Sequence, residues 1–279
     1  MRRRPCAGFL LAVTLGAVSL APVSSVADDA QAALALGDAA WERRAEGDDH
    51  DGKAAPGSIG EAIRAYESAA AAAPRALLPR WKLVRALYFS ADFASASVDE
   101  ERAQLDRATA AADAARPLLG SASARDAAAA HFWSAIVWGA WSQRHGLLAA
   151  VREGVMNRVH DDALAVVELE PTFEEGGAYR LLARLHASLP RIPLLSGWVD
   201  RAQALPAIER ALAIAPRHLG NRLLFALTLL DVAPERREEA LSVLESLAMA
   251  EPRPEQRVEE FSIRRTARER LAKERSAAR

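Results

Sequence analysis

The chain has 279 residues, of which 51% are hydrophobic and 26% are charged, and its formal net charge is −1. This composition is that of a water-soluble globular protein, and the near-zero charge argues against a nucleic-acid-binding surface. Alanine, leucine, glutamate and arginine dominate, all of them good helix formers, whereas β-branched runs are absent, as are Asn-Gly or Asp-Gly hairpin turns between alternating segments. We therefore predict an all-α fold.

The first 27 residues have the three parts of a secretory signal sequence. Arg2-Arg3-Arg4 supplies a positive end, Gly8–Leu20 an apolar stretch, and Ser25-Val26-Ala27 a small-x-small cleavage site. The apolar stretch is about 13 residues long, short of the roughly 20 needed to span a bilayer. We predict a signal peptide over residues 1–27 that is cleaved between Ala27 and Asp28; the alternative is an uncleaved membrane anchor.

Cys6 is the only cysteine, and it precedes the apolar stretch, whereas the cysteine of a lipoprotein would follow it. We therefore expect neither lipid attachment nor disulfide bonds in the mature chain, whose stability must come from core burial. Without Arg2, Arg3 and Arg4 the basic count falls from 36 to 33 against 37 acidic residues, which gives a net charge of −4. The leader predicts a bacterial periplasmic location, with export from the cell as the alternative.

The mature chain opens with a predicted helix over Ala30–Arg44, and the acidic segment Gly47–Gly60 after it is predicted to be a loop. An EF-hand-like calcium loop that started at Asp48 would place Ile59 where a bidentate glutamate is needed. We therefore expect a solvated insertion here, not a metal site.

From residue 61 onward, a pattern of small, large and small residues followed by a proline recurs along the chain. Its offsets of 0, 4, 7 and 12 place the first three residues on one helix face, and the proline ends the helix. The copies are Ala62, Tyr66, Ala69 and Pro74; Val159, Ala163, Val166 and Pro171; Ala204, Ile208, Ala211 and Pro216; and Ala240, Leu244, Leu247 and Pro252.

A second pattern, of an aromatic, a large, a small and a ring residue, precedes some of these copies. Its best example is Tyr179-x2-Leu182-Ala183-x2-His186; Trp81-x2-Val84-Arg85-x2-Tyr88 is another, and a degraded copy spans residues 135–142. Together the two patterns have the spacing of tetratricopeptide (TPR) helix pairs, which pack small residues against large ones. The four prolines stand 97, 45 and 36 residues apart, against about 34 for a regular array.

Between Pro74 and Pro171, Leu105–Arg116 forms a further predicted helix that ends at Pro117, and Ala91–Glu101 is a predicted polar insertion. We therefore expect an irregular TPR-like helical-hairpin solenoid of about five helix pairs over residues 28–254. The charged segment 255–279 is predicted to be a capping helix with a frayed, solvated end.

Residues 131–141 are the most aromatic part of the chain. His131, Trp138 and His145 stand seven apart on one helical stripe, with Trp141 beside them. Two interpretations stay open, a buried central helix and an apolar ligand cleft with polar tips.

Two further segments follow. Glu174–Gly177 is predicted to be a helix start, and the apolar insertion Ser188–Val199 is predicted to fold back on its own helix pair or to lie in an interface.

Enzymatic function has one candidate motif, His160-Asp161-Asp162, which resembles the His-Asp pair of helical metal phosphohydrolases. His131, His145 and His186 would have to complete such a site. No His-x-Glu, His-Glu-x2-His or nucleophile-elbow motif accompanies it, and acids at a helix start have an ordinary role there. We predict no catalytic residues, no metal and no cofactor.

The order of these features resembles the T-component (TatT) family of tripartite ATP-independent periplasmic (TRAP) transporters over roughly residues 30–250. Ala183 departs from that family, in which a glycine is common there, and the lipoprotein cysteine of some members is missing. The resemblance implies cryptic TPR units, association with a periplasmic solute-binding subunit, possible trimerisation and an apolar channel. It rests on Ala40-Trp41-Glu42-Arg43, Arg80-Trp81-x-Leu83-x2-Ala86-Leu87-Tyr88-Phe89, His131-Phe132-Trp133, Trp138-Gly139-x-Trp141 and Gly176-Gly177-x-Tyr179-Arg180-Leu181-Leu182-Ala183.

The expected function is that of a non-catalytic binding protein, an accessory component of a TRAP-type transporter; the alternative is a general TPR scaffold for envelope proteins. The expected partners are a solute-binding subunit or another envelope protein, an apolar small ligand and further copies of the chain. In TPR stacks the first helix of each pair lines the concave face, so contacts are predicted at Trp81, Tyr88, His131, Trp138, Trp141, His145 and Tyr179.

Overall fold

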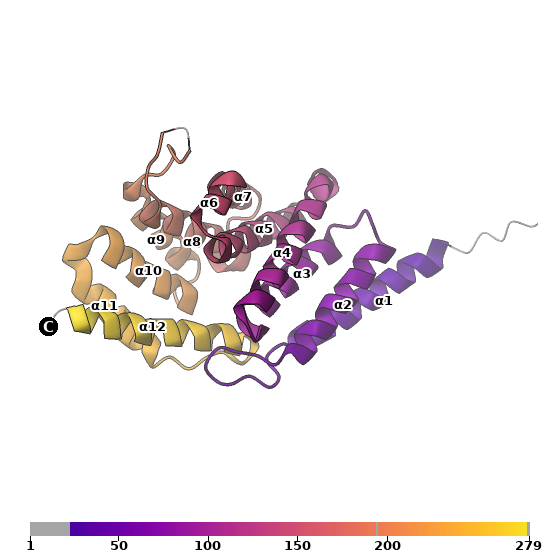
Figure 1. Cartoon of the computed structure of the whole chain (residues 1–279), viewed down its shortest axis with the longest axis horizontal. Coiled ribbons are helices and arrows are strands. Elements are labelled where there is room, and N and C mark those ends of the chain that lie inside the picture. Colours follow the sequence, from indigo (N-terminus) through magenta and orange to yellow (C-terminus); the bar gives the residue numbers. More distant parts are fainter. Residues whose placement is uncertain (1–22, 194, 278–279) are drawn as a thin grey trace, which may run out of the picture.

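The computed structural model describes residues 23–193 and 195–277, and over them it has twelve α-helices and no β-strand (Figure 1). The all-α prediction is confirmed for this part of the chain. The first 22 residues of the predicted leader lie outside it, and its last five begin α1. The helices are α1 Val23–Glu42, α2 Pro56–Ala72, α3 Leu78–Phe89, α4 Val98–Ala115, α5 Ala124–His145, α6 Leu147–Arg152, α7 Val155–Leu169, α8 Phe173–Ser188, α9 Ala204–Ile214, α10 Leu219–Val232, α11 Arg237–Ala248 and α12 Arg257–Ala277.

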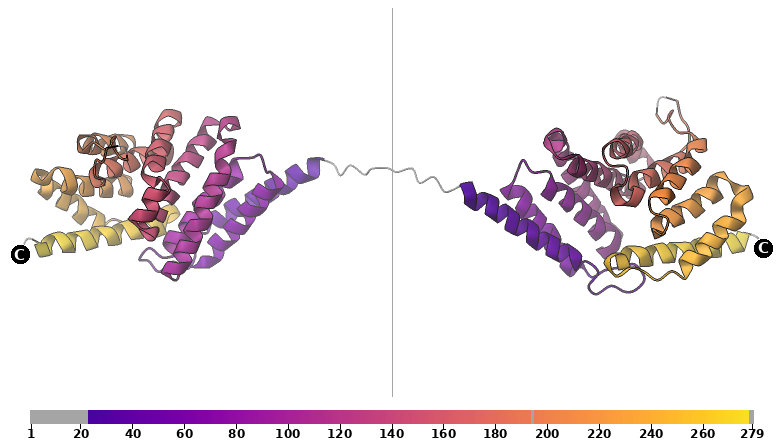
Figure 2. Two further views of the ribbon diagram at one scale, coloured as in Figure 1. Left: turned by 45° about the horizontal axis from the view of Figure 1, so that its top comes forward. Right: turned by 180° about the vertical axis from the view of Figure 1, so that it is seen from behind.

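Most helices pack on their neighbours in the chain. The most extensive pairings are α1 with α2, α5 with α7, α8 with α9, and α3 with α4; α4 with α5, α10 with α11 and α2 with α3 come next. The first helices of successive pairs also touch, since α3 packs on α5, α5 on α8 and α8 on α10. The pairs follow one another along an arc from α1 to α11 (Figures 1 and 2). None of the described helices is both long enough and apolar enough to span a membrane.

Small residues allow the helices of each pair to approach closely. The alanines of the recurring pattern, from Ala62 and Ala69 to Ala211 and Ala240, are at most 1% exposed, and their large partners Tyr66, Ile208 and Leu244 are 0% exposed. The prolines follow the helix ends. Pro74, Pro171 and Pro216 each stand two residues after the last residue of a helix, and Pro252 stands four after α11. Leu182 and Ala183 are buried on α8.

Two glycines provide a matched test of this packing. A Cβ at Gly37 in α1 would lie 2.5 Å from the Tyr66 ring, whereas a Cβ at Gly139 in α5 would meet nothing within 4 Å. We expect Gly37→Ala to destabilise the protein by about 1–3 kcal/mol through overpacking. Gly139→Ala should stabilise it by about 0.5–1 kcal/mol, because alanine is the better helix residue. Urea unfolding measures both, and shifts of the same sign would contradict the packing between α1 and α2.

The acidic loop is shorter and less solvated than predicted. It ends at Ala55, because Pro56 has the backbone geometry of a first helical turn. The Asp48 side chain is only 2% exposed and forms an ion pair with Arg257 of α12. A Cβ at Gly52 would lie 2.8 Å from the backbone of Ser262, which is also in α12. The loop therefore packs against the last helix.

The predicted polar insertion Ala91–Glu101 is also wrong at both ends. Ser90–Ala94 forms a π-helical turn whose Phe93 and Ala94 are buried. The Phe93 ring packs against Phe89 with ring centroids 5.0 Å apart, and the Phe93 carbonyl accepts a hydrogen bond of 2.8 Å from the Ala54 N–H. Apolar burial of Phe93 holds this turn against the core, and α4 begins at Val98, before the predicted helix start at Leu105.

The apolar insertion after α8 folds back on the protein, but not only on its own helix pair as predicted, because it also contacts α7 of the preceding pair. Trp198 stacks on His160 of α7 with ring centroids 3.9 Å apart, and its indole N–H donates to Asn157. Val199 is 2% exposed, while Ile192 remains 42% exposed. The insertion packs on α7 as well as on α8, and its residue 194 is not described.

The last helix joins the two ends of the arc. Ala267 and Leu271 of α12 pack with α10 and α11. At its beginning, Glu259 accepts a hydrogen bond of 2.9 Å from Arg44, which follows α1. Arg44 also donates to the carbonyl of Glu255. In Figure 1, α12 runs along the bottom of the view from the C-terminus to the loop after α1. The charged segment 255–279 is thus a packed closing helix over its described residues.

Candidate ligand cavity

The closing helix covers a cavity of about 250 Å³ on the inner side of the arc. Its walls come from the first helices of the pairs and from α12, segments far apart in the sequence. The lining residues are Trp41, Arg44, Arg85, Tyr88, Phe89, Phe93, Trp133, Glu174, His218, Gln256, Glu259 and Ile263.

One side of the cavity is aromatic. Tyr88 packs against Trp133 and Phe93 with ring centroids 6.0 and 6.2 Å apart, and Trp41 meets Phe89 edge-on at 5.7 Å. The Tyr88 hydroxyl donates to Asp92 at 3.3 Å, and burial raises the pKa of Tyr88. The phenol therefore stays neutral. Its ring forms part of the apolar wall, and its hydroxyl is already hydrogen-bonded to Asp92.

Arg85 provides an isolated charge in this wall. Its guanidinium lies 3.8 Å from the centroid of the Trp41 ring and 5.3 Å from that of Trp81. Its Nε is buried without a hydrogen-bond partner, and no carboxylate of the described residues lies within 4.0 Å of it. Burial lowers the pKa of Arg85, and Tyr66 and Glu174 oppose that shift. Stacking on tryptophan holds the cation in place without neutralising it.

Glu174 reaches the cavity from an unusual backbone turn. Glu174, Glu175 and Gly176 at the start of α8 have φ values of 48, 55 and 84°, all in the left-handed region. Such conformations cost about 1–3 kcal/mol for a residue other than glycine and are concentrated at functional sites. Asn221 and Arg180 both donate to the Glu175 carbonyl and hold the turn. The helix start was correctly predicted at this segment, but its first residues are left-handed.

Burial sets the protonation of the groups around this turn. Burial raises the pKa of Glu174, with Arg85 and Arg180 opposing it. For His218, burial and the nearby Arg180 and Arg253 lower the pKa to about 3. Its imidazole is therefore neutral at physiological pH. Nδ1 accepts from the Asn221 N–H at 3.1 Å, and Nε2 lies 3.3 Å from the Glu175 carboxylate, to which it donates.

A polar depression adjoins the cavity and shares Glu174 and Gln256 with it. This depression, of about 400 Å³, is also lined by Arg125, Thr172 and Arg253. Glu174 and Gln256 thus stand between the aromatic interior and a polar surface. A ligand with an apolar body and a polar end would meet matching surroundings along this path.

Only one of the seven predicted contact residues, Tyr88, lines the cavity. Trp81 lies beside it, where its indole N–H donates to Asp126 at 3.0 Å. Tyr179 packs with Ala183, Ile208 and Ala211 between α8 and α9. Both are helix-packing residues rather than cavity walls.

The aromatic stripe of α5 lies elsewhere. Trp138 is 5% exposed in the main core. Trp141 stacks on His145 with ring centroids 4.1 Å apart. The Trp141 indole N–H donates to Asp106 of α4, and His145 Nε2 lies 3.1 Å from the same carboxylate. For these three residues, the structure favours the core and helix-packing interpretation over the ligand cleft.

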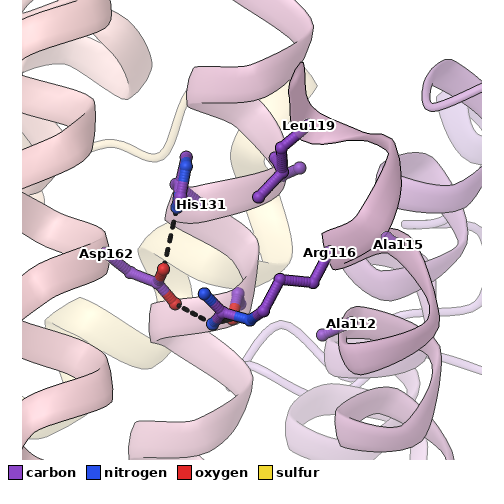
Figure 3. Close-up of a pocket in the computed structure, with 8 residues that line it drawn as sticks. Ala112, Ala115, Arg116, Leu119, His131 and Asp162 are labelled. Carbon is purple, nitrogen blue, oxygen red and sulfur yellow. Dashed lines mark hydrogen bonds and ion pairs between the residues drawn. The ribbon is translucent and has the colours of Figure 1, made fainter. Parts of the chain in front are cut away.

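His131, the remaining predicted residue, belongs to a buried ion-pair network (Figure 3). Its Nδ1 lies 2.8 Å from Asp162, whose other oxygen accepts a hydrogen bond of 3.0 Å from Arg116. The space beside them is about 10 Å³, room for a single water. Asp162 is the third residue of the phosphohydrolase-like motif, and here it joins α5 to α7. Within the described residues, no cluster of three or more His, Cys, Asp or Glu could hold a metal.

Asp162 gives a pH prediction. Burial alone would raise the pKa of Asp162, but hydrogen bonds from His131 and Ser134 and the charge of Arg116 outweigh it, so the pKa is lowered from 3.8. A carboxyl group whose pKa is lower in the folded than in the unfolded state stabilises the fold. That stabilisation is complete above the pKa of the unfolded state and is lost as the pH falls through the pKa of the folded state. We expect the melting temperature to fall more steeply below about pH 4 in the wild type than in Asp162→Asn. Parallel curves would contradict this role.

Sequence reasoning missed most of the cavity residues. One signal was present at Arg85, which occupies the position where the first-helix pattern has a small residue. A second was Trp41, in the segment Ala40-Trp41-Glu42-Arg43 on which the family resemblance rests. No local pattern marks Glu259 or Ile263, because their place depends on how α12 returns to the beginning of the arc. No protein-family model matches this chain, and no curated protein matches it.

Proposed function

We propose that this protein is a non-catalytic, TPR-like binding protein that holds a small organic ligand in the cavity closed by α12. The TPR-like arrangement is supported by the buried alanine stripes and by the contacts between first helices of successive pairs. In such a stack the first helices line one side, and α1, α3, α5 and α8 all contribute to the cavity.

The observation that carries the ligand proposal is a cavity in which an aromatic wall adjoins two charged side chains without a direct ion-pair partner. Tyr88, Phe93 and Trp133 belong to that wall. Within the described residues, neither Arg85 nor Glu174 has an opposite charge within 4.0 Å. A buried charge without a partner is destabilising, and a bound molecule that pairs with both groups would offset that cost.

A cavity-filling variant tests this proposal. Gln256→Trp would put a bulky ring at the boundary between the cavity and the polar depression, and Gln203→Trp, at an exposed position, is its control. We expect native mass spectrometry of protein from its own cells to show a small-molecule adduct in the wild type and in Gln203→Trp. The adduct should be lost from Gln256→Trp. Equal occupancy in all three would place the ligand elsewhere, and no adduct in any would refute binding.

The resemblance to TRAP T-components supports a more specific role, as a periplasmic accessory protein that passes its ligand to or from a solute-binding subunit. Reading frames beside this gene should then encode transporter subunits. The expected result of co-expression with the neighbouring solute-binding protein is a complex in size-exclusion chromatography. Separate elution, with unrelated neighbouring genes, would favour a general envelope scaffold instead.

A further inference from the structure

Two arginines and two glutamates line the cavity, and the protein joins only one of each in a direct ion pair. Arg44 and Glu259 form an ion pair of 2.9 Å and neutralise one another. Within the described residues, neither the Arg85 guanidinium nor the Glu174 carboxylate has an opposite charge within 4.0 Å. The lining therefore offers one cation and one acid that lack a direct ion-pair partner, at a single cavity.

These two groups lie on different sides of the cavity. Arg85 belongs to the aromatic wall formed by α3 and α5, and Glu174 stands at the boundary with the polar depression. A ligand that pairs with both must itself present an acceptor anion and a donor cation.

From this arrangement, and resting on the proposed ligand-binding function, we infer that the ligand is a zwitterion with an apolar body, of the chemical class of an aromatic or large aliphatic amino acid. Its carboxylate pairs with Arg85, and its ammonium group pairs with Glu174. Its apolar body lies against Tyr88 and the neighbouring phenylalanines.

Ligands with one charge fit less well. A simple carboxylate would satisfy Arg85 but would bring a second negative charge toward Glu174 and Glu259. A simple amine would satisfy Glu174 and leave Arg85 unpaired and buried beside another cation. Size permits the proposed class, since a cavity of about 150 Å³ is enough to hold benzene and this one is about 250 Å³.

The test uses three probes with one carbon skeleton: phenylalanine, 3-phenylpropionate, which lacks the ammonium group, and 2-phenylethylamine, which lacks the carboxylate. Titration calorimetry with ligand-stripped full-length mature protein measures each affinity. We expect phenylalanine to bind at least about tenfold more tightly than either analogue, as loss of a charged hydrogen-bonding group implies.

Charge-specific variants make the test selective. Arg85→Gln should lower the affinity for phenylalanine and for 3-phenylpropionate about 10- to 100-fold, while the affinity for 2-phenylethylamine should not change. Glu174→Gln should have the converse effect. It should lower the affinity for phenylalanine and 2-phenylethylamine and leave the affinity for 3-phenylpropionate unchanged. Arg107→Gln is the control, because Arg107 forms an exposed ion pair with Glu67 outside the cavity.

The outcomes separate this inference from the proposed function. A one-charge analogue that binds as tightly as phenylalanine, or variants that weaken all three probes equally, would overturn the zwitterion assignment and leave a ligand cavity in place. No binding of any probe would overturn the assignment as well. If the adduct in native mass spectrometry is then also absent, the proposed function falls with it.

Discussion

Replacing Trp138 with alanine should lower the free energy of unfolding by about 3–5 kcal/mol, the usual loss for truncating a large buried side chain. Trp138 is 5% exposed, packs against Trp141 with ring centroids 5.3 Å apart, and lies under the Arg158 guanidinium at 4.0 Å. Its removal would leave a cavity in the contact between α5 and α7 and strand the stacked cation. Urea unfolding of the mature chain measures the loss.

Leu148→Ala is the control for this variant, because Leu148 is 85% exposed and its truncation should change stability by no more than about 0.5 kcal/mol. Ligand affinity, measured under conditions where Trp138→Ala remains folded, should stay close to that of the wild type. A variant that unfolds like the wild type but loses its ligand would show that Trp138 is a contact residue and not core.

Arg44→Met should lower the free energy of unfolding by about 2–4 kcal/mol. This is somewhat less than the loss from breaking a fully buried ion pair, because the Glu259 side chain is 27% exposed. Arg44 is 7% exposed at its side chain, donates to Glu259 and to the carbonyl of Glu255, and stacks on Trp41 with its guanidinium carbon 4.4 Å from the ring centroid. Methionine keeps much of the apolar stem and removes the charge. The loss should be concentrated at the closure between the loop after α1 and α12.

Hydrogen exchange locates this loss. Amides of residues 43–55 and of the first half of α12 should exchange faster in Arg44→Met, while α9 and α11 stay protected. Arg275→Gln breaks an ion pair with Glu245 on the same closing helix, but both side chains are more than half exposed, so the change should stay below about 1 kcal/mol. If the two variants behave alike, α12 is not held by Arg44.

The helical architecture was readable from the sequence because its signals are local. Ala62, Tyr66 and Ala69 repeat at helical spacing and Pro74 follows the helix end, and the same physics acts in each copy. The contact residues were harder to predict, since an aromatic side chain on a helix fits both a core and a binding site. Trp138, Trp141 and Trp133 all lie on one aromatic helix. Only the packing of α4, α7 and α12 around that helix determines that Trp133 lines the cavity and that Trp138 and Trp141 do not.

The cavity itself depends on long-range and unusual features. Arg44 meets Glu259 across more than 200 residues of chain, a contact that no periodic pattern marks. The two glutamates in left-handed conformation contradict the ordinary preference of the residue type, so the direction of Glu174 could not be read from its sequence. Arg85 was a local clue, as a large cation at a position where the repeat has a small residue.

The most direct test of the closed ligand cavity is a crystal structure of the protein purified without denaturation from its own cells. We expect density for a small molecule between Arg85 and Glu174, covered by α12, with Arg44 paired to Glu259. A cavity filled by the protein's own side chains, or an α12 displaced from the loop after α1, would contradict this account.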